Sequence, residues 1–189
     1  MNLSWVRQNL LVMAMAGLSA CANLAPQDES LSFYPVPAGS KIILHQDLQV
    51  PPNSVRAYMQ HGQVVKAPSP FDPYCQFEVN DVLPVAQTIK ADEFVVRKTQ
   101  MGEQHIASGN AFLKAGTGVS FGARPGSRDV LLVWYLWLDS PRQPNVRRMI
   151  CGGKFDAAYR ARRPSINEIR AQLGSIATLS VVQKPGAGQ

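Results

Sequence analysis

The chain has 189 residues, a formal net charge of +6 and an apolar fraction of 46%. This length is enough for one domain with a hydrophobic core. After residue 20, no apolar run approaches the roughly 18 residues that a membrane-spanning helix needs, and this excludes a transmembrane helix there. The 14 glycines and 14 prolines favour short strands joined by turns.

The N-terminal segment has each part of an export signal. Arg7 supplies a positive charge, and residues 10–18 form an apolar core that is too short to span a bilayer. Small residues then lead to a cysteine in Leu18-Ser19-Ala20-Cys21. This order of features resembles the signal peptide and lipobox of bacterial lipoproteins. The alternative is an ordinary secretory signal that contains a cysteine by chance.

The resemblance implies that residues 1–20 are a signal peptide that is removed, and that Cys21 then receives a diacylglycerol on its thiol and an acyl chain on its new amino group. Two or more acyl chains hold a protein firmly on a membrane. Residue 22 is alanine and not aspartate, which in this class favours the periplasmic face of the outer membrane over the inner membrane. Residues 21–40 are rich in proline and polar residues, and they predict a lipidated N-terminus followed by a tether.

Four segments in the first half of the domain predict β-strands. Residues 41–50 are β-branched and apolar, and residues 55–65 alternate in polarity until a glycine interrupts them. Residues 75–79 place their apolar side chains on one face, and residues 94–101 form a fourth strand. Residues 102–128 contain spaced glycines and predict no clear element.

The second half contains the longest apolar strand. Residues 130–138 are apolar without alternation, which predicts a central strand covered on both faces, and residues 146–155 return as its hairpin partner. Ser165-Ile166-Asn167-Glu168 is a capping box, and it predicts a helix that Gly174 can end. Residues 177–182 predict a last strand.

These elements predict a mainly β fold, either an antiparallel β-sandwich or a partly closed barrel, that carries one late α-helix. A single β-rich domain is expected over residues 41–183, with a flexible tail over residues 184–189. Beyond the signal and lipobox, the sequence resembles no characterised family.

Two cysteines remain once Cys21 carries lipid. An even number in an oxidising periplasm predicts a disulfide between Cys75 and Cys151. The alternative is a free nucleophile or a metal-binding pair. Both cysteines lie in apolar strand segments, however, with no adjacent histidine that would lower a thiol pKa.

Residues that usually carry catalysis or bind metals are few. His45, His61 and His105 lack the spacing of a metal site, and the sequence has no serine-nucleophile or phosphate-loop motif. His45 stands near Asp47 but predicts a locally hydrogen-bonded histidine more simply than a base. We therefore assign no catalytic residue, no metal site and no cofactor.

Positive charge is concentrated between residues 142 and 170, where eight basic residues accompany two acidic ones. Such a run attracts polyanions, and in the periplasm these are anionic lipids, lipopolysaccharide phosphates and peptidoglycan carboxylates rather than nucleic acid. The predicted anion-contacting patch consists of Arg147, Arg148, Arg160, Arg162 and Arg163. The alternative is a basic loop that only keeps the protein soluble.

The sequence thus predicts a non-catalytic, membrane-anchored lipoprotein that supports or joins an envelope assembly through an envelope protein or an anionic component. The alternative is a lipid or amphiphile carrier, with a β-shell cavity lined by Trp134 and Trp137. A hydrolase with an unrecognised site is a weaker third hypothesis. A filled core would favour the adaptor, and an apolar hollow would favour the carrier.

The lipobox gives the first testable prediction. We expect Cys21→Ser to abolish lipid labelling and to leave unprocessed precursor in the inner membrane, because the thiol is the acceptor of the diacylglycerol. Metabolic labelling with palmitate and partitioning into a detergent phase measure these effects. Normal maturation and partitioning of the variant would contradict the lipoprotein assignment.

Overall fold

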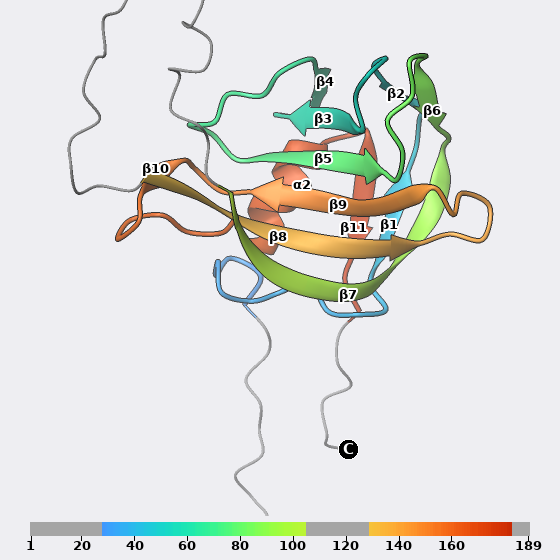
Figure 1. Cartoon of the computed structure of the whole chain (residues 1–189). Helices are drawn as coiled ribbons and strands as arrows, with labels where there is room; N and C mark the ends of the chain where they lie inside the picture. Colours follow the sequence, from blue (N-terminus) through green and yellow to red (C-terminus); the bar gives the residue numbers. More distant parts are fainter. Residues whose placement is uncertain (1–27, 105–128, 183–189) are drawn as a thin grey trace, which may run out of the picture. The chain divides into compact units, whose positions relative to one another are not determined.

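The computed structural model describes residues 28–104 and 129–182. This part of the chain is mostly antiparallel β-sheet and has one α-helix, α2 (Ile166–Leu173) (Figure 1). The main sheet has the order β11-β1-β7-β8-β9-β5-β3-β4, with β10 paired to β8, while β2 and β6 form a separate pair. The strands are β1 (Lys41–Leu44), β2 (Leu48–Val50), β3 (Arg56–Gln60), β4 (Gln63–Val65), β5 (Tyr74–Val79), β6 (Gln87–Ile89), β7 (Asp92–Gln104), β8 (Asp129–Asp139), β9 (Val146–Gly152), β10 (Asp156–Ala157) and β11 (Ala177–Ser180).

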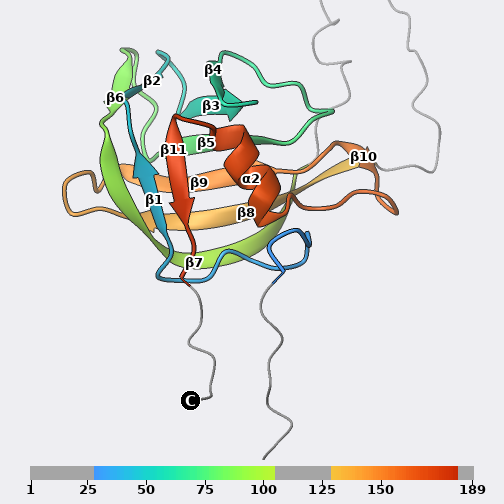
Figure 2. The same ribbon diagram turned by 180° about the vertical axis from the view of Figure 1, so that it is seen from behind.

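The main sheet curls into a half-barrel, and α2 lies on its concave side beside β11 (Figure 2). Ile166, Ile169 and Leu173 of α2 are fully buried, and they belong to the same hydrophobic cluster as Phe77 and Met149 of the sheet. The helix thus fills the inside of the curl. The predicted mainly β fold with one late helix is confirmed, in its partly closed form.

Local contacts at both of its ends define α2. The capping box is formed, because the Glu168 amide donates to Ser165 Oγ at 3.2 Å and the Ser165 amide donates to Glu168 Oε2 at 2.9 Å. At the other end Gly174 has a φ of +53°, and a Cβ there would lie 2.5 Å from the Gly62 Cα. Glycine at this position therefore lets the β3–β4 turn pack directly against the end of the helix.

Two predicted strands are each divided in the structure. The segment 41–50 forms β1 and β2, which belong to different sheets, and the segment 55–65 forms the β3–β4 hairpin. The chain turns after β1 where the Asp47 carboxylate accepts hydrogen bonds from Lys90 Nζ at 2.8 Å and from the Ala91 amide at 2.9 Å. This contact joins residues more than 40 positions apart, so a local sequence pattern cannot indicate it.

The domain begins earlier than Lys41. Val36 and Ser40 are buried, and the Gly39 amide donates to the Val96 carbonyl at 2.8 Å. Thr99 Oγ1 donates to the Val36 carbonyl at 2.6 Å. Residues 36–40 are therefore packed against the sheet, so the packed domain begins before the predicted boundary at Lys41.

Several predictions concern residues that the structure does not describe. The signal peptide, Cys21, His105 and the tail over residues 184–189 all lie outside the described ranges. Within those ranges, no helix is both long enough and apolar enough to cross a membrane.

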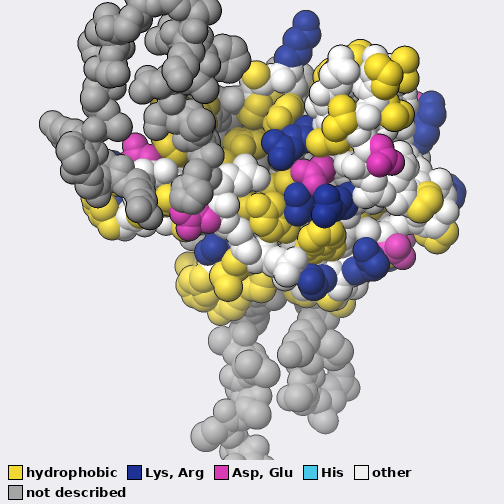
Figure 3. All heavy atoms as spheres, viewed as in Figure 1, with side chains coloured by type: hydrophobic (Ala, Val, Ile, Leu, Met, Phe, Trp, Pro, Cys, Tyr) yellow, Lys and Arg dark blue, Asp and Glu magenta, His cyan; other side chains and the backbone are white. Residues whose placement is uncertain are grey.

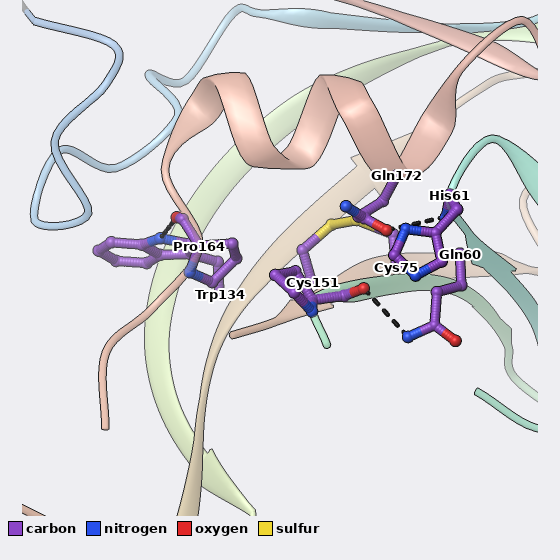
Figure 4. The surroundings of a disulfide bond; sticks show 8 residues. Gln60, His61, Cys75, Trp134, Cys151, Pro164 and Gln172 are labelled. Atoms are coloured by element: carbon purple, nitrogen blue, oxygen red, sulfur yellow. Dashed lines mark hydrogen bonds between the residues drawn. A yellow bond between two sulfur atoms is a disulfide. The ribbon is translucent and has the colours of Figure 1, made fainter. Parts of the chain in front are cut away.

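The predicted disulfide is present. Cys75 and Cys151 lie directly opposite each other on β5 and β9, and both are fully buried beneath α2 (Figure 4). The bond joins residues 76 positions apart and ties two neighbouring strands at the centre of the sheet.

We expect replacement of both cysteines by serine to lower the free energy of unfolding by about 3 kcal/mol, because closing a long loop restricts the unfolded chain. Denaturant titration of the oxidised protein and of the variant measures the difference. Non-reducing peptide mapping is the control for the linkage. Alkylation of both thiols in the freshly extracted native protein would show that the disulfide is not formed.

Candidate functional site: a basic cluster around Trp137

The convex face of the main sheet, away from α2, carries a row of polar and aromatic side chains across five strands. The row joins Arg56 of β3, Glu78 of β5, Arg148 of β9, Trp137 of β8 and Lys98 of β7, each directly opposite the next. Directly opposed side chains on one face of a sheet have their Cβ atoms about 4.5–5.5 Å apart. The register therefore brings three basic residues, one acid and one tryptophan together from distant parts of the sequence.

Two β-bulges flank Trp137. In β7, Arg97 is an extra residue against β8, and in β9, Arg147 is an extra residue against β5. A bulge interrupts the regular ladder and re-aims the side chains around it. Each bulge therefore allows two consecutive basic residues, Arg97–Lys98 and Arg147–Arg148, to approach the same tryptophan.

These side chains form what we call the Trp137 cluster: Arg56, Glu78, Arg97, Lys98, Trp137, Arg147 and Arg148. The guanidinium carbons of Arg147 and Arg148 lie 5.2 and 5.1 Å from the centroid of the Trp137 ring, and Lys98 Nζ lies 5.9 Å from it. An indole attracts cations at such distances. Trp137 Nε1 donates to Gln100 Oε1 at 2.6 Å, which helps to fix the ring.

Glu78 is the acid at the centre of the cluster. Its side chain is only 5% exposed, its Oε1 accepts a hydrogen bond from Arg148 Nε at 2.8 Å, and Arg148 Nη2 lies 2.7 Å from the same oxygen. Arg56 Nε lies 3.5 Å from Oε2, and Arg147 Nη1 lies 3.8 Å from Oε1. One buried carboxylate thus contacts three guanidinium groups. It positions them but neutralises only part of their charge.

Arg56 stays charged in this setting. Burial lowers the pKa of Arg56, but its interactions with Tyr58 and Glu78 outweigh burial and raise the pKa above its usual value. Arg56 Nε and Gln76 Nε2 are buried and have no hydrogen-bond partner among the described residues. Arg56 is therefore held beside Glu78 by an ion pair and not by a hydrogen bond from Nε.

A surface depression of about 370 Å³ opens beside the cluster. Figure 3 shows Lys and Arg side chains gathered around an acidic one over the middle of this face. Guanidinium groups bind carboxylate and phosphate oxygens through paired hydrogen bonds. The arrangement therefore suits an anionic ligand. The depression is lined by Asn80, Arg97, Trp137, Leu138, Asp139, Ser140, Pro144, Val146 and Arg147.

The structure divides the predicted anion-contacting patch into two regions. Arg147 and Arg148 belong to the Trp137 cluster, whereas Arg160, Arg162 and Arg163 follow β10, which pairs with the opposite end of β8. Seven residue steps along β8 separate Val130, which pairs with β10, from Trp137, and at about 3.3 Å per residue they span about 23 Å. The five arginines therefore do not form one surface.

The arginines of the second region already have interaction partners within the domain. Arg160 Nη2 contacts Asp156 Oδ1 at 2.7 Å, and Arg162 forms two hydrogen bonds of 2.6 Å with the Glu168 carboxylate. The hydrogen bonds from Arg162 lower the pKa of Glu168 to about 2, although partial burial opposes the change. Arg163 Nε donates to a backbone carbonyl of β8 at 3.2 Å. The charges of Arg160 and Arg162 are therefore paired within the domain.

Four residues of the Trp137 cluster were not indicated as a site by the sequence: Arg56, Glu78, Arg97 and Lys98. The sequence does contain a signal for the bulges, because consecutive charged residues interrupt otherwise alternating strands at Arg97–Lys98 and Arg147–Arg148. Two such interruptions on strands that flank a tryptophan would have indicated the cluster, had the strand order been known.

The histidines do not form a catalytic arrangement in the described residues. His45 Nε2 lies 2.7 Å from Thr178 Oγ1, while Asp47 pairs with Lys90. His61 Nε2 lies 4.0 Å from Asp72 Oδ2, and both side chains are exposed. Within the same ranges, no group of three potential metal-ligating side chains occurs.

No protein-family model matches the chain, and no curated protein or solved structure matches it either. The role of the Trp137 cluster must therefore follow from its own geometry and charge. Those properties are excess fixed positive charge, an aromatic support and an open depression beside them.

The buried position of Glu78 leads to a stability prediction. We expect Glu78→Gln to lower the free energy of unfolding by about 3 kcal/mol, because removal of one partner of a buried ion pair leaves the other charge uncompensated. Denaturant titration measures the change. Glu93→Gln is the matched control, since Glu93 forms an exposed pair with Lys41 at 2.8 Å and should contribute less than about 1 kcal/mol. Similar losses in the two variants would contradict the central position of Glu78.

Proposed function

We propose that the protein is a non-catalytic lipoprotein, anchored through Cys21 to the periplasmic face of the outer membrane, that binds an anionic group of an envelope partner at the Trp137 cluster. The observation that carries the proposal is the crowding of three guanidinium groups around the buried Glu78 carboxylate, with Lys98 beside the same tryptophan. Like charges repel, so such a grouping is maintained by Glu78, by Trp137 and by the two bulges.

The cluster is preorganised for an anion. Its cations are held by strands and by the indole ring, and not by a loop. Binding therefore orders few side chains and loses little conformational entropy. Lipopolysaccharide phosphates, anionic lipid headgroups, peptidoglycan carboxylates and an acidic surface of an envelope protein all carry the complementary charge. Nucleic acid is not expected in the proposed compartment.

The positions of Trp134 and Trp137 favour the adaptor over the carrier, because a carrier cavity would need both side chains in its lining. Trp134 belongs to the core on the concave side and donates from Nε1 to the Pro164 carbonyl at 3.0 Å, whereas Trp137 lies on the convex face. They lie on opposite faces of β8 and cannot line one cavity. The concave side itself is filled by α2.

The proposal predicts where substitutions weaken binding. We expect Arg147→Gln combined with Lys98→Gln to weaken anion binding about tenfold at low salt, because the two cations beside Trp137 are lost. Arg160→Gln combined with Arg162→Gln is the matched control. It also removes two charges, but from side chains already paired with Asp156 and Glu168, and should change binding less than about twofold.

The measurement uses the lipidated protein in nanodiscs of zwitterionic lipid, titrated separately with lipopolysaccharide, soluble peptidoglycan fragments and anionic vesicles at two salt concentrations. Added salt should weaken binding to the parent protein and have a smaller effect on the Arg147/Lys98 variant. If the control variant loses as much affinity as the Arg147/Lys98 variant, the site is not at the Trp137 cluster. Absence of salt-sensitive binding to all three would refute the proposed anion contact.

A further inference from the structure

The first described residues form a turn that is docked on α2. The Ser30 amide and hydroxyl both donate to Asp28 Oδ1, at 2.9 and 2.6 Å, which closes the turn. Glu29 forms an ion pair with Arg170 of α2 and accepts a hydrogen bond from the Asn167 amide through its carbonyl at 3.3 Å. The turn therefore has a fixed orientation on the domain.

This turn directs apolar side chains outward. Phe33 is 66% exposed and Leu31 is 37% exposed, although both lie in a segment that is held in place. They line a surface depression of about 520 Å³ beside the paired side chains of Arg162 and Glu168. Exposed aromatic and aliphatic side chains match the boundary between lipid headgroups and acyl chains.

The position of this surface along the chain restricts what can cover it. Seven residue steps separate Cys21 from Asp28, and a fully extended chain spans at most about 25 Å over that length. If Cys21 carries lipid, the turn lies within this distance of the bilayer. Leu31 and Phe33 follow directly in the sequence.

We propose that the surface formed by Leu31 and Phe33 rests on the phospholipid bilayer that holds the anchor. The two apolar side chains enter the headgroup region, and the ion pair between Arg162 and Glu168 lies beside them with its charges balanced. This inference rests on the lipid anchor of the proposed function and is independent of the Trp137 cluster. It assigns the domain an orientation on the membrane as well as an attachment.

The orientation leaves the Trp137 cluster accessible. Residues 28–40 lie at one end of the domain, while β2 and β6 lie at the opposite end, in both views (Figures 1 and 2). The convex face of the sheet runs between these ends. With the turn on the bilayer, this face points sideways into the periplasm, where a partner can reach it.

The test places a fluorescent reporter at each end of the full-length lipidated protein in liposomes. Phe33→Trp reports on the turn, and Val85→Trp, at a 62% exposed position two residues before β6, is the matched control at the far end. Fluorescence of the parent protein, which contains Trp134 and Trp137, is subtracted. Lipids brominated near the headgroup should quench the Phe33→Trp signal and shift its emission to the blue, and should leave the Val85→Trp signal unchanged.

Mass spectrometry of the N-terminal peptide shows whether Cys21 carries lipid, and so distinguishes a missing anchor from a missing membrane-contacting surface. If Cys21 carries lipid and neither reporter is quenched, or both are quenched equally, the membrane-contacting surface is refuted while the anchor stands. A photocrosslinker at position 33 that captures a protein in cells, and not lipid, would also refute it. If Cys21 carries no lipid, the anchor and this inference fail together.

Discussion

The two β-bulges beside Trp137 are the constraint on which the arrangement of the site depends. Without the extra residues Arg97 and Arg147, strict alternation would place the side chains of consecutive basic residues on opposite faces of the sheet. With them, both flanking strands present two cations to β8. Bulges also bend a strand and increase its twist, so the same two positions favour the curl that wraps the sheet around α2.

The strand between the bulges has different chemistry on its two faces. Trp134, Leu136 and Leu138 point into the core with α2, whereas Tyr135 and Trp137 lie on the convex face. The ring of Tyr135 packs over Gly102 of β7, where a Cβ would lie only 2.1 Å from a ring carbon. Arg148 in turn stacks on Tyr135, with its guanidinium carbon 4.5 Å from the ring centroid. The glycine, two aromatic rings and the arginine therefore form a continuous support for the cations.

The fold class could be predicted because short sequence patterns indicate it, and the disulfide could be predicted from the number of cysteines. The capping box at Ser165 defines one helix, alternation defines most strands, and two remaining cysteines can pair in only one way. The division of the segment 41–50 could not be predicted, because it depends on the contact between Asp47 and Lys90. The early start of the domain likewise depends on Val36 and Gly39 contacting β7.

The site was only partly predictable because contacts between residues that are distant in the sequence define it. Arg147 and Arg148 were recognised as basic, but proximity in sequence grouped them with Arg160, Arg162 and Arg163. Strand order and bulges instead group them with Lys98 and Arg56, which are distant in the sequence. Arg160 also forms an ion pair with Asp156, four residues earlier, which the prediction of one anion-contacting patch did not include.

A nuclear magnetic resonance titration tests most directly whether the bulges create a site for an anion. The arginine Nε–Hε and tryptophan Nε1–H signals are followed while inorganic pyrophosphate, a small anionic probe, is added. If the bulges create a site for an anion, the largest shifts will occur at Arg147, Arg148 and Trp137, while Arg160 and Arg162 remain unchanged. The largest shifts at Arg160 and Arg162, or equal shifts at every exposed arginine, would contradict this account of the molecule.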